Sequence, residues 1–215
     1  LVQHQGEAEP SKIEITRAEI ELPSVAFEMR GDIALLNIMY FSGRTDKELS
    51  QALHGIDEQG ATGIVLDLRS NPGGLLEAVV DVASQFLSGG VVVQIRDSQG
   101  KITVRNVRSG KVATDLPMVV LVDNFSASGS EVLAGALRDN ARAVIAGSKT
   151  YGKGSVNIVH PLTDGSSLSI TTARWLTPNG YLIEGEGLHP DIELDPDAED
   201  AVEWAINYLK DSECG

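Results

Sequence analysis

The sequence predicts an α/β protein whose helices cover a largely buried sheet. Its middle part repeats a unit in which a continuous apolar strand leads through a turn of small residues into an amphipathic helix. Continuous apolar strands that alternate with helices are typical of sheets covered on both faces. With 215 residues, 42% of them hydrophobic and 22% charged, the chain is long enough for one substantial core.

The elements that precede the repeated unit are short and partly polar. Residues 1–10 form a polar tail. Strands are predicted after it from runs of β-branched and apolar residues, and a helix from a cap-like threonine, an acidic first turn and helical spacing of apolar positions. In order, these elements are the strands Lys12–Arg17, Val25–Met29 and Ile33–Ile38 and the helix Thr45–His54.

The repeated unit occurs twice. Strand Gly63–Leu68 leads through a turn into helix Leu75–Phe86, and strand Leu116–Val122 leads through a second turn into helix Glu131–Arg138. The other predicted elements are the strands Val91–Ile95, Ile102–Val107, Ala143–Ala146, Ser155–Pro161 and Ser167–Ala173, the turns Asp97–Gly100 and Pro178–Gly180, and a closing helix at Ala198–Leu209.

The composition argues against several classes of protein. The 17 basic and 31 acidic side chains give a formal net charge of -14, which repels nucleic-acid phosphates. The single cysteine, Cys214, permits no internal disulfide, and the sequence has no Cys/His cluster for structural zinc. No apolar run approaches the roughly 20 residues that span a bilayer. Because the chain begins with leucine, we expect a fragment or a processed form, from which an export signal or anchor could have been removed.

The stretch Gly147–Ser155, GSKTYGKGS, comes within one residue of a phosphate-binding loop. Such a loop needs a hydroxyl directly after its lysine to hold Mg²⁺, and a following helix whose N–H groups bind phosphate. Gly154 occupies the hydroxyl position, and a strand is predicted to follow. The pattern therefore argues against a nucleotide site. Lys153 is then either a solvated turn residue, as lone lysines usually are, or has another role.

Ser128 lies at a strand-to-helix turn, where backbone N–H groups point out of the positive end of the helix. A serine there can attack a carbonyl while neighbouring N–H groups stabilise the oxyanion, provided that a base takes its proton. The alternative is structural: Ser128-Gly-Ser-Glu131 fits the capping box S-x-x-E, which satisfies the first turn of a helix. Local sequence alone favours the cap.

A base for Ser128 is not obvious among the histidines. His4 lies in the tail, His54 in a polar helix, and two others directly before prolines, His160 and His189. No G-x-S-x-G motif is present, although a triad can assemble across sequence distance. Lysine also serves as a base for serine when burial or a nearby cation lowers its pKa. Lys153, flanked by glycines, is a candidate if it packs tightly.

Four motifs follow one another along the chain: Leu66–Gly74 (LDLRSNPGG), Phe125–Glu131 (FSASGSE), Tyr151–Val156 (YGKGSV) and Gly187–Ile192 (GLHPDI). With them the chain resembles the carboxyl-terminal processing peptidases, also called tail-specific proteases. Lys153 follows Ser128 by 25 residues, as the family pattern requires. The resemblance extends from about Ser24 onward, and it implies a crotonase-like fold in which βα units wind around a mixed sheet.

The resemblance implies a serine endopeptidase that cleaves proteins near their C-terminus through an acyl-enzyme. Ser128 matches the family nucleophile and Lys153 its general base, and Gly129 and Gly74 match the oxyanion hole. The charged positions expected to support the site are Asp67, Arg69 and Glu131. No metal, nucleotide or organic cofactor is implied.

The chain departs from the family pattern at three points. Asn157 stands where members commonly have a glutamine that orients the lysine amine, and Gly129 replaces an alanine. Members also carry a PDZ module, which captures apolar C-terminal tails by strand addition, before the peptidase core. We expect residues 24–215 to form the core, and residues 1–23 to be a tail and remnant strand at the boundary with the missing module.

Two other functions remain open at this level. One is a catalytically idle relative that binds a peptide or a hydrophobic ligand; the other is an acyl-CoA enzyme of the crotonase type, for which neither acidic catalytic residues nor an adenine site is found. The expected partners are proteins with apolar, unstructured C-terminal tails, with a homo-oligomer or an adaptor protein as a further possibility. By resemblance we expect an extracytoplasmic location, such as the bacterial periplasm or its equivalents.

Overall fold

The computed structural model describes residues 1–3, 5–6, 9–14, 16, 22–110, 113–195 and 200–213. Its larger sheet has six strands, and β1 is antiparallel to β2 while every other neighbouring pair is parallel. The predicted α/β class with a mixed sheet is therefore confirmed. In spatial order the strands are β1 (Val25–Arg30), β2 (Ile33–Ile38), β3 (Gly63–Asp67), β6 (Met118–Val122), β7 (Val144–Gly147) and β10 (Ile192–Glu193).

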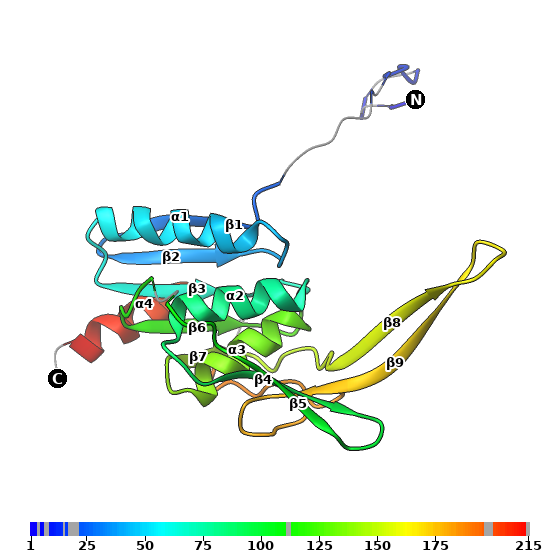
Figure 1. Ribbon diagram of the computed structural model, residues 1–215. Coiled ribbons are helices and arrows are strands. Elements are labelled where there is room, and N and C mark those ends of the chain that lie inside the picture. Colours follow the sequence, from blue (N-terminus) through cyan, green and yellow to red (C-terminus); the bar gives the residue numbers. More distant parts are fainter. Residues whose placement is uncertain are drawn as a thin grey trace.

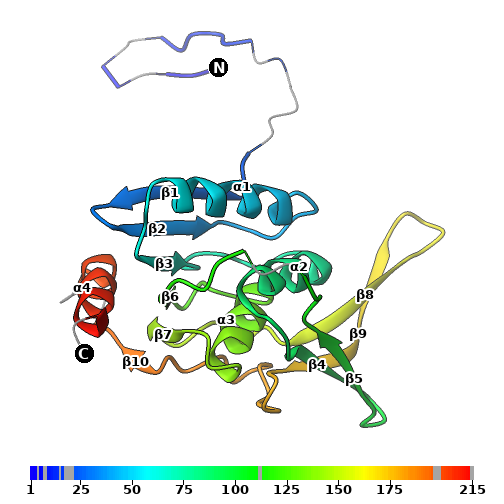
Figure 2. The ribbon, with the colours of Figure 1, turned by 60° about the vertical axis from the view of Figure 1, so that its left-hand side comes forward.

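Helices cover both faces of the central strands, as Figure 2 shows for α4 on one side and α2 and α3 on the other. Strand β3 is buried throughout, so its alternate side chains enter different cores: Ile64 and Leu66 join the larger cluster, while Val65 packs with Leu209 of α4. The helices are α1 (Thr45–Glu58), α2 (Leu76–Phe86), α3 (Gly129–Asp139) and α4 (Ala201–Glu213).

A second, antiparallel sheet packs beside the helices, with the strand order β5-β4-β9-β8. Its inner side chains, such as Trp175 and Val93, belong to the larger core. Beyond that core, β8 and β9 continue as a two-stranded ribbon that projects from the body (Figure 1), on which Ile158, Leu168 and Ile170 are at least half exposed. The strands are β4 (Val91–Asp97), β5 (Ile102–Asn106), β8 (Ser155–Pro161) and β9 (Ser167–Leu176).

Most predicted elements are present with ends shifted by a few residues. Helix α1 runs four residues beyond the predicted end, because Ile56 continues the buried stripe of Leu49 and Leu53. Of the strand predicted at Lys12–Arg17, residues 15 and 17 lie outside the described residues, and 12–14 and 16 have no strand assignment. The predicted start of the closing helix, Ala198, the tail residue His4 and Cys214 also lie outside the described residues. Among the described residues, none of the helices is long and apolar enough to cross a membrane.

Three neighbouring parallel strands place the candidate residues together. Strands β3, β6 and β7 are adjacent, so their carboxyl ends lie at the same edge of the sheet. The loops that leave these ends carry Gly74, Ser128 and Lys153, respectively. The chain after Lys153 is strand β8, which confirms the predicted strand and removes the helix that a phosphate-binding loop requires.

The start of β1 is fastened to α1 through Glu48, and this contact predicts a pH dependence of stability. Glu48 accepts both the N–H and the hydroxyl of Ser24 at 2.6 Å. The Ser24 hydroxyl, more than any other group, lowers the pKa of Glu48 below its ordinary value of 4.5, against an opposing effect of burial. A lowered pKa in the folded state means that the stabilisation is complete above pH 4.5 and is lost as the pH falls through the lowered value.

We therefore expect Glu48→Gln to lower the free energy of unfolding by about 1 kcal/mol at neutral pH, and by less at acid pH. Urea denaturation at both pH values measures the two differences. Glu58→Gln on the same helix is the control, since that side chain is 67% exposed. An equal loss at both pH values would contradict the assignment to the ionised carboxylate.

Candidate active site

Ser128 stands on a sharp turn between β6 and α3. Its φ is 59° and its ψ is -112°, an unusual backbone conformation for a residue with a side chain, and the residue is only 9% exposed. The turn is held by Asp123, whose carboxylate accepts the N–H groups of Phe125 and Ser126, and by the Ser126 hydroxyl, which donates to the Leu68 carbonyl. Such a strained strand-to-helix turn presents a serine hydroxyl at the carboxyl edge of a sheet.

The turn after β3 packs directly against the Ser128 turn through Asn71. This fully buried side chain donates to the Ile38 carbonyl at 2.7 Å and accepts the Gly73 N–H at 2.8 Å. Its backbone carbonyl accepts the Ala127 N–H at 3.0 Å and the Ser130 hydroxyl at 2.8 Å. One asparagine thus joins the end of β2, the glycine turn and the start of α3.

Gly73 is required by close packing. It has a φ of 97°, and a Cβ added there would lie 2.7 Å from the Ser128 Cβ and 2.6 Å from the Gly129 nitrogen. The absence of a side chain therefore lets the glycine turn approach the serine turn at backbone distance.

Two backbone N–H groups meet beside Ser128. The Gly74 nitrogen lies 3.4 Å from the position that a Cβ on Gly129 would take. In the part of the chain that the structure describes, neither the Gly74 N–H nor the Gly129 N–H donates to a protein acceptor. The structure thus brings Ser128, Gly129 and Gly74 together, and the two donors have the chemistry of an oxyanion hole.

Glu131 is the fully buried centre of the hydrogen bonds around Ser128. Its Oε1 accepts the Thr150 hydroxyl and the Gly152 N–H, each at 2.6 Å. Its Oε2 accepts the Ser128 N–H and the Lys153 N–H, each at 2.8 Å. The predicted capping box between Ser128 and Glu131 is present. The same carboxylate also fixes the loop that carries Lys153.

The backbone of Lys153 is tightly held, whereas its side chain is exposed. Gly154 donates its N–H to Glu184 at 2.8 Å, and a Cβ on Gly154 would lie 2.4 Å from the Glu184 nitrogen. Among the described residues, no hydrogen bond joins the Lys153 amine to the Ser128 hydroxyl. The glycines that flank Lys153 are tightly packed, but the lysine side chain itself is not.

Asn157 lies on β8 beside a bulge in its pairing with β9. Its Oδ1 accepts the Thr171 hydroxyl at 2.7 Å. In this structure the amide therefore pairs across the ribbon, and among the described residues no hydrogen bond connects it with Lys153.

Asp67 and Arg69 form a pair at the end of β3. Asp67 is buried and accepts the backbone N–H of Arg69 and two of its guanidinium nitrogens, at 2.6–3.0 Å. The Asp67 hydrogen bond, ahead of an opposing effect of burial, raises the pKa of Arg69. The pair fixes the first residues of the turn that leads from β3 to Asn71. Arg69 also lines a cavity of about 160 Å³ with Asp123 and Ser148.

Three residues of the site were not singled out from the sequence: Asn71, Thr150 and Glu184. Asn71 lies in the LDLRSNPGG motif, where an asparagine before Pro-Gly-Gly predicts only a turn. Thr150 and Glu184 have no local signal, since their partners are 19 and 30 residues away along the chain. The described histidines His54, His160 and His189 make no hydrogen bond with Ser128.

Comparisons with known proteins agree with this geometry. Residues 32–194 match the sequence profile of Peptidase family S41. The chain is 40% identical over 191 residues to the carboxyl-terminal-processing protease of Synechocystis sp., which covers 86% of this chain and 44% of that protein. It is 38% identical over 195 residues to the carboxy-terminal-processing protease of Bartonella bacilliformis, covering 88% and 45%.

Two of the solved structures similar to this chain are also proteases. A structure titled photosystem II D1 C-terminal processing protease superposes with a TM-score of 0.77 at 36% identity, over 90% of this chain and 54% of that one. The tricorn protease, at 18% identity and a TM-score of 0.63, shares the fold. The chain spans less than half the length of the two curated relatives named above.

Glu131→Gln should loosen the two loops that carry Ser128 and Lys153. The substitution replaces one acceptor oxygen with a donor. Because three of the four partners are backbone N–H groups, which cannot accept, one or two hydrogen bonds are lost inside the core. We expect a loss of about 3 kcal/mol in the free energy of unfolding and faster amide exchange at Ser128, Gly152 and Lys153. Chemical denaturation and hydrogen exchange measure the two effects. Glu186→Gln, on an exposed loop, is the control; faster exchange in both variants would overturn the assignment.

A methyl group at Gly73 should disrupt the serine turn. The new Cβ would meet backbone atoms that cannot rotate away, at a φ that side chains rarely adopt. We expect Gly73→Ala to cost about 3 kcal/mol or more of folding free energy. Gly89→Ala is the matched control, because a Cβ there meets nothing within 4 Å. Thermal unfolding of both variants tests this, and an intact melting temperature for Gly73→Ala would contradict the close approach.

Proposed function

The chain belongs to peptidase family S41, and on that premise we propose that it is the peptidase core of a carboxyl-terminal-processing serine endopeptidase that uses Ser128 and Lys153. The observation that carries the proposal is the shared Glu131 oxygen. The backbone nitrogens of Ser128 and Lys153 each lie 2.8 Å from Oε2, so they are within twice that distance of each other. A lysine side chain has four rotatable methylenes, enough to bring its amine to the serine hydroxyl from there.

In the proposed reaction Ser128 Oγ attacks the scissile carbonyl while Lys153 takes its proton. The N–H groups of Gly129 and Gly74 stabilise the oxyanion of the tetrahedral intermediate. Lys153 then donates a proton to the leaving amine, which departs with the C-terminal piece. Water, deprotonated by the same lysine, hydrolyses the ester and regenerates the serine.

For this cycle the Lys153 side chain must move from its exposed position into contact with Ser128. The required change is a rotation of the side chain, because Glu131 and Glu184 already hold the backbone on both sides of the lysine. A bound substrate would exclude water from the space between the amine and the Ser128 hydroxyl. To orient the amine, the Asn157 side chain would have to leave the Thr171 hydroxyl and form a hydrogen bond with Lys153 instead.

The same proposal covers the parts outside the site. We assign residues 24–215 to the peptidase core, in keeping with the family match over residues 32–194, and residues 1–23 to a tail at the boundary with a PDZ module. The proposed substrates are proteins with apolar, unstructured C-terminal tails, and the proposed location is extracytoplasmic. No cofactor takes part in the proposed chemistry.

Cleavage of an unstructured protein with an apolar tail tests the proposal. Ser128→Ala and Lys153→Ala should each lower the rate at least about 100-fold, because one removes the nucleophile and the other its base. Lys149→Ala, an exposed lysine on the same loop, should keep the wild-type rate. Circular dichroism confirms folding of each variant.

Two results would count against the dyad. Cleavage that survives both substitutions means that other residues react. No cleavage by the wild-type chain, even after a PDZ module from a relative is joined to its N-terminal end, would favour a binding protein that has lost catalysis.

A further inference from the structure

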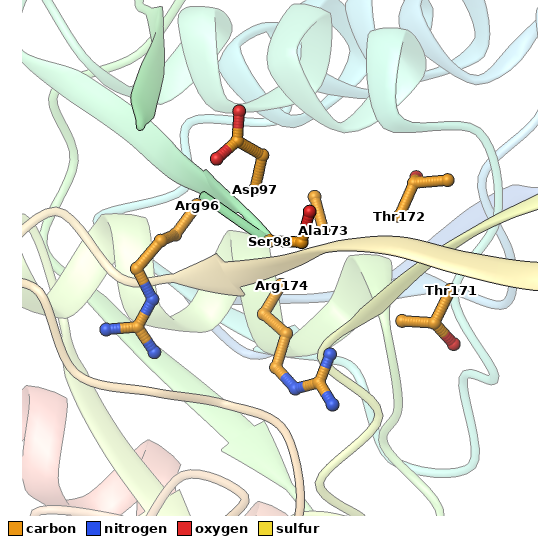
Figure 3. A pocket seen from close by; sticks show the side chains of 7 residues that line it. All are labelled: Arg96, Asp97, Ser98, Thr171, Thr172, Ala173 and Arg174. Atoms are coloured by element: carbon orange, nitrogen blue, oxygen red, sulfur yellow. The ribbon is translucent and has the colours of Figure 1, made fainter. Parts of the chain in front are cut away.

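Two arginines face each other across the second sheet. Arg96 of β4 and Arg174 of β9 are direct partners in the antiparallel ladder, so their side chains emerge on the same face. Figure 3 shows both guanidinium groups on one side of the strands, at a cavity of about 210 Å³ that Thr171 and Ser98 also line. Like charges directly opposite each other are unfavourable in a ladder, so the pair requires an explanation.

Within the described part of the chain, no carboxylate forms an ion pair with either arginine, although the sequence has 31 acidic residues. The nearest acidic residue in sequence, Asp97, points to the opposite side of the strands in Figure 3. Its Oδ1 accepts the N–H groups of Gln99 and Lys101 in the hairpin turn. By contrast, Arg105 on β5 and Arg108 contact Glu77, and Arg108 also pairs with Asp81.

The pair adjoins the candidate active site. Arg174 is the ladder partner of Ser155, which lies two residues after Lys153. The next residue, Trp175, donates its N–H to the Gly154 carbonyl at 2.7 Å, so the strand pairing continues to the lysine loop. The carboxylate of Glu184 is already bonded to the Gly154 N–H. The two arginines, which have no ion pair among the described residues, thus lie on the strands that join the lysine loop.

We propose that Arg96 and Arg174 bind a carboxylate group of the substrate polypeptide. Two guanidinium groups on one face offer charge-assisted, forked hydrogen bonds to the planar carboxylate. The carboxylate can be the free C-terminus or an acidic side chain near it. This inference rests on the proposed function, because it assigns to the peptidase core a means of sensing where the substrate chain ends.

Peptide binding tests the inference without cleavage. The Ser128→Ala chain is titrated at low ionic strength with a labelled peptide that ends in apolar residues, prepared with either a free C-terminal carboxylate or a carboxamide. We expect the free acid to bind about fivefold more tightly, as suits exposed ion pairs, and the preference to fade with added salt. A third peptide, with a carboxamide end and one nearby glutamate, distinguishes the two sources of the carboxylate.

Substitutions connect the preference to the two arginines. Arg96→Gln combined with Arg174→Gln should bring the ratio of the two affinities close to one, whereas the double replacement by lysine should keep most of it. Arg105→Gln is the matched control on the neighbouring strand, because its guanidinium pairs with Glu77. A ratio that stays at the wild-type value in the double glutamine variant overturns the inference, as does the absence of any preference in the starting protein.

Cleavage by the chain with Ser128 intact separates this inference from the proposed function. If both peptides are cleaved at equal rates and bound equally, the endopeptidase proposal stands and the carboxylate site fails. The opposite result is a preference for the free acid in binding that disappears when the arginines are replaced, with cleavage of neither peptide. In that case the carboxylate site stands and the proposed catalysis fails.

Discussion

The buried carboxylate of Glu131 is the interaction on which the rest of the site depends. Burying an ionised carboxylate costs several kcal/mol unless hydrogen bonds compensate for the lost water. Here four donors do so, from the start of α3 and from the loop after β7, and the position in the first turn of α3 adds the favourable helix dipole. Loss of any of these hydrogen bonds would leave a polar group without a partner on both sides of the contact. The two loops are therefore fixed together. The helix cap and the contact that would support the proposed nucleophile are thus the same.

The parallel order of β3, β6 and β7 brings three loops to one edge, and small residues let those loops touch. Gly73 permits contact with the serine turn, and Gly154 permits contact with the loop of Glu184. Asn71 satisfies the polar groups that such close backbone contact would otherwise leave unpaired. The strained backbone of Ser128 is stabilised by these surrounding contacts and not by its own conformation.

The sequence predicted the α/β class, nearly all described elements and the turns that carry Ser128 and Gly74, because buried strands, caps and glycine turns leave local signals. It did not predict that β4, β5, β8 and β9 form a separate sheet, since strand pairing is decided by contacts far apart in sequence. It identified Glu131 but not its partner Thr150, which has no signal of its own. The side-chain positions of Lys153 and Asn157 depend on rotamers and on neighbours across the ribbon, which motif spacing does not encode.

The projecting ribbon of β8 and β9 affects how this protein behaves in concentrated solution. Strand β8 is at the edge of its sheet, so its outer backbone groups are open to pairing with another chain, and apolar side chains such as Ile158 are exposed beside them. Opposing this attraction, a net charge of -14 makes whole molecules repel one another. Colloidal stability therefore depends on the balance between attraction through the exposed apolar ribbon and repulsion by the net negative charge. Because salt screens only the charge repulsion, ionic strength determines which of the two prevails.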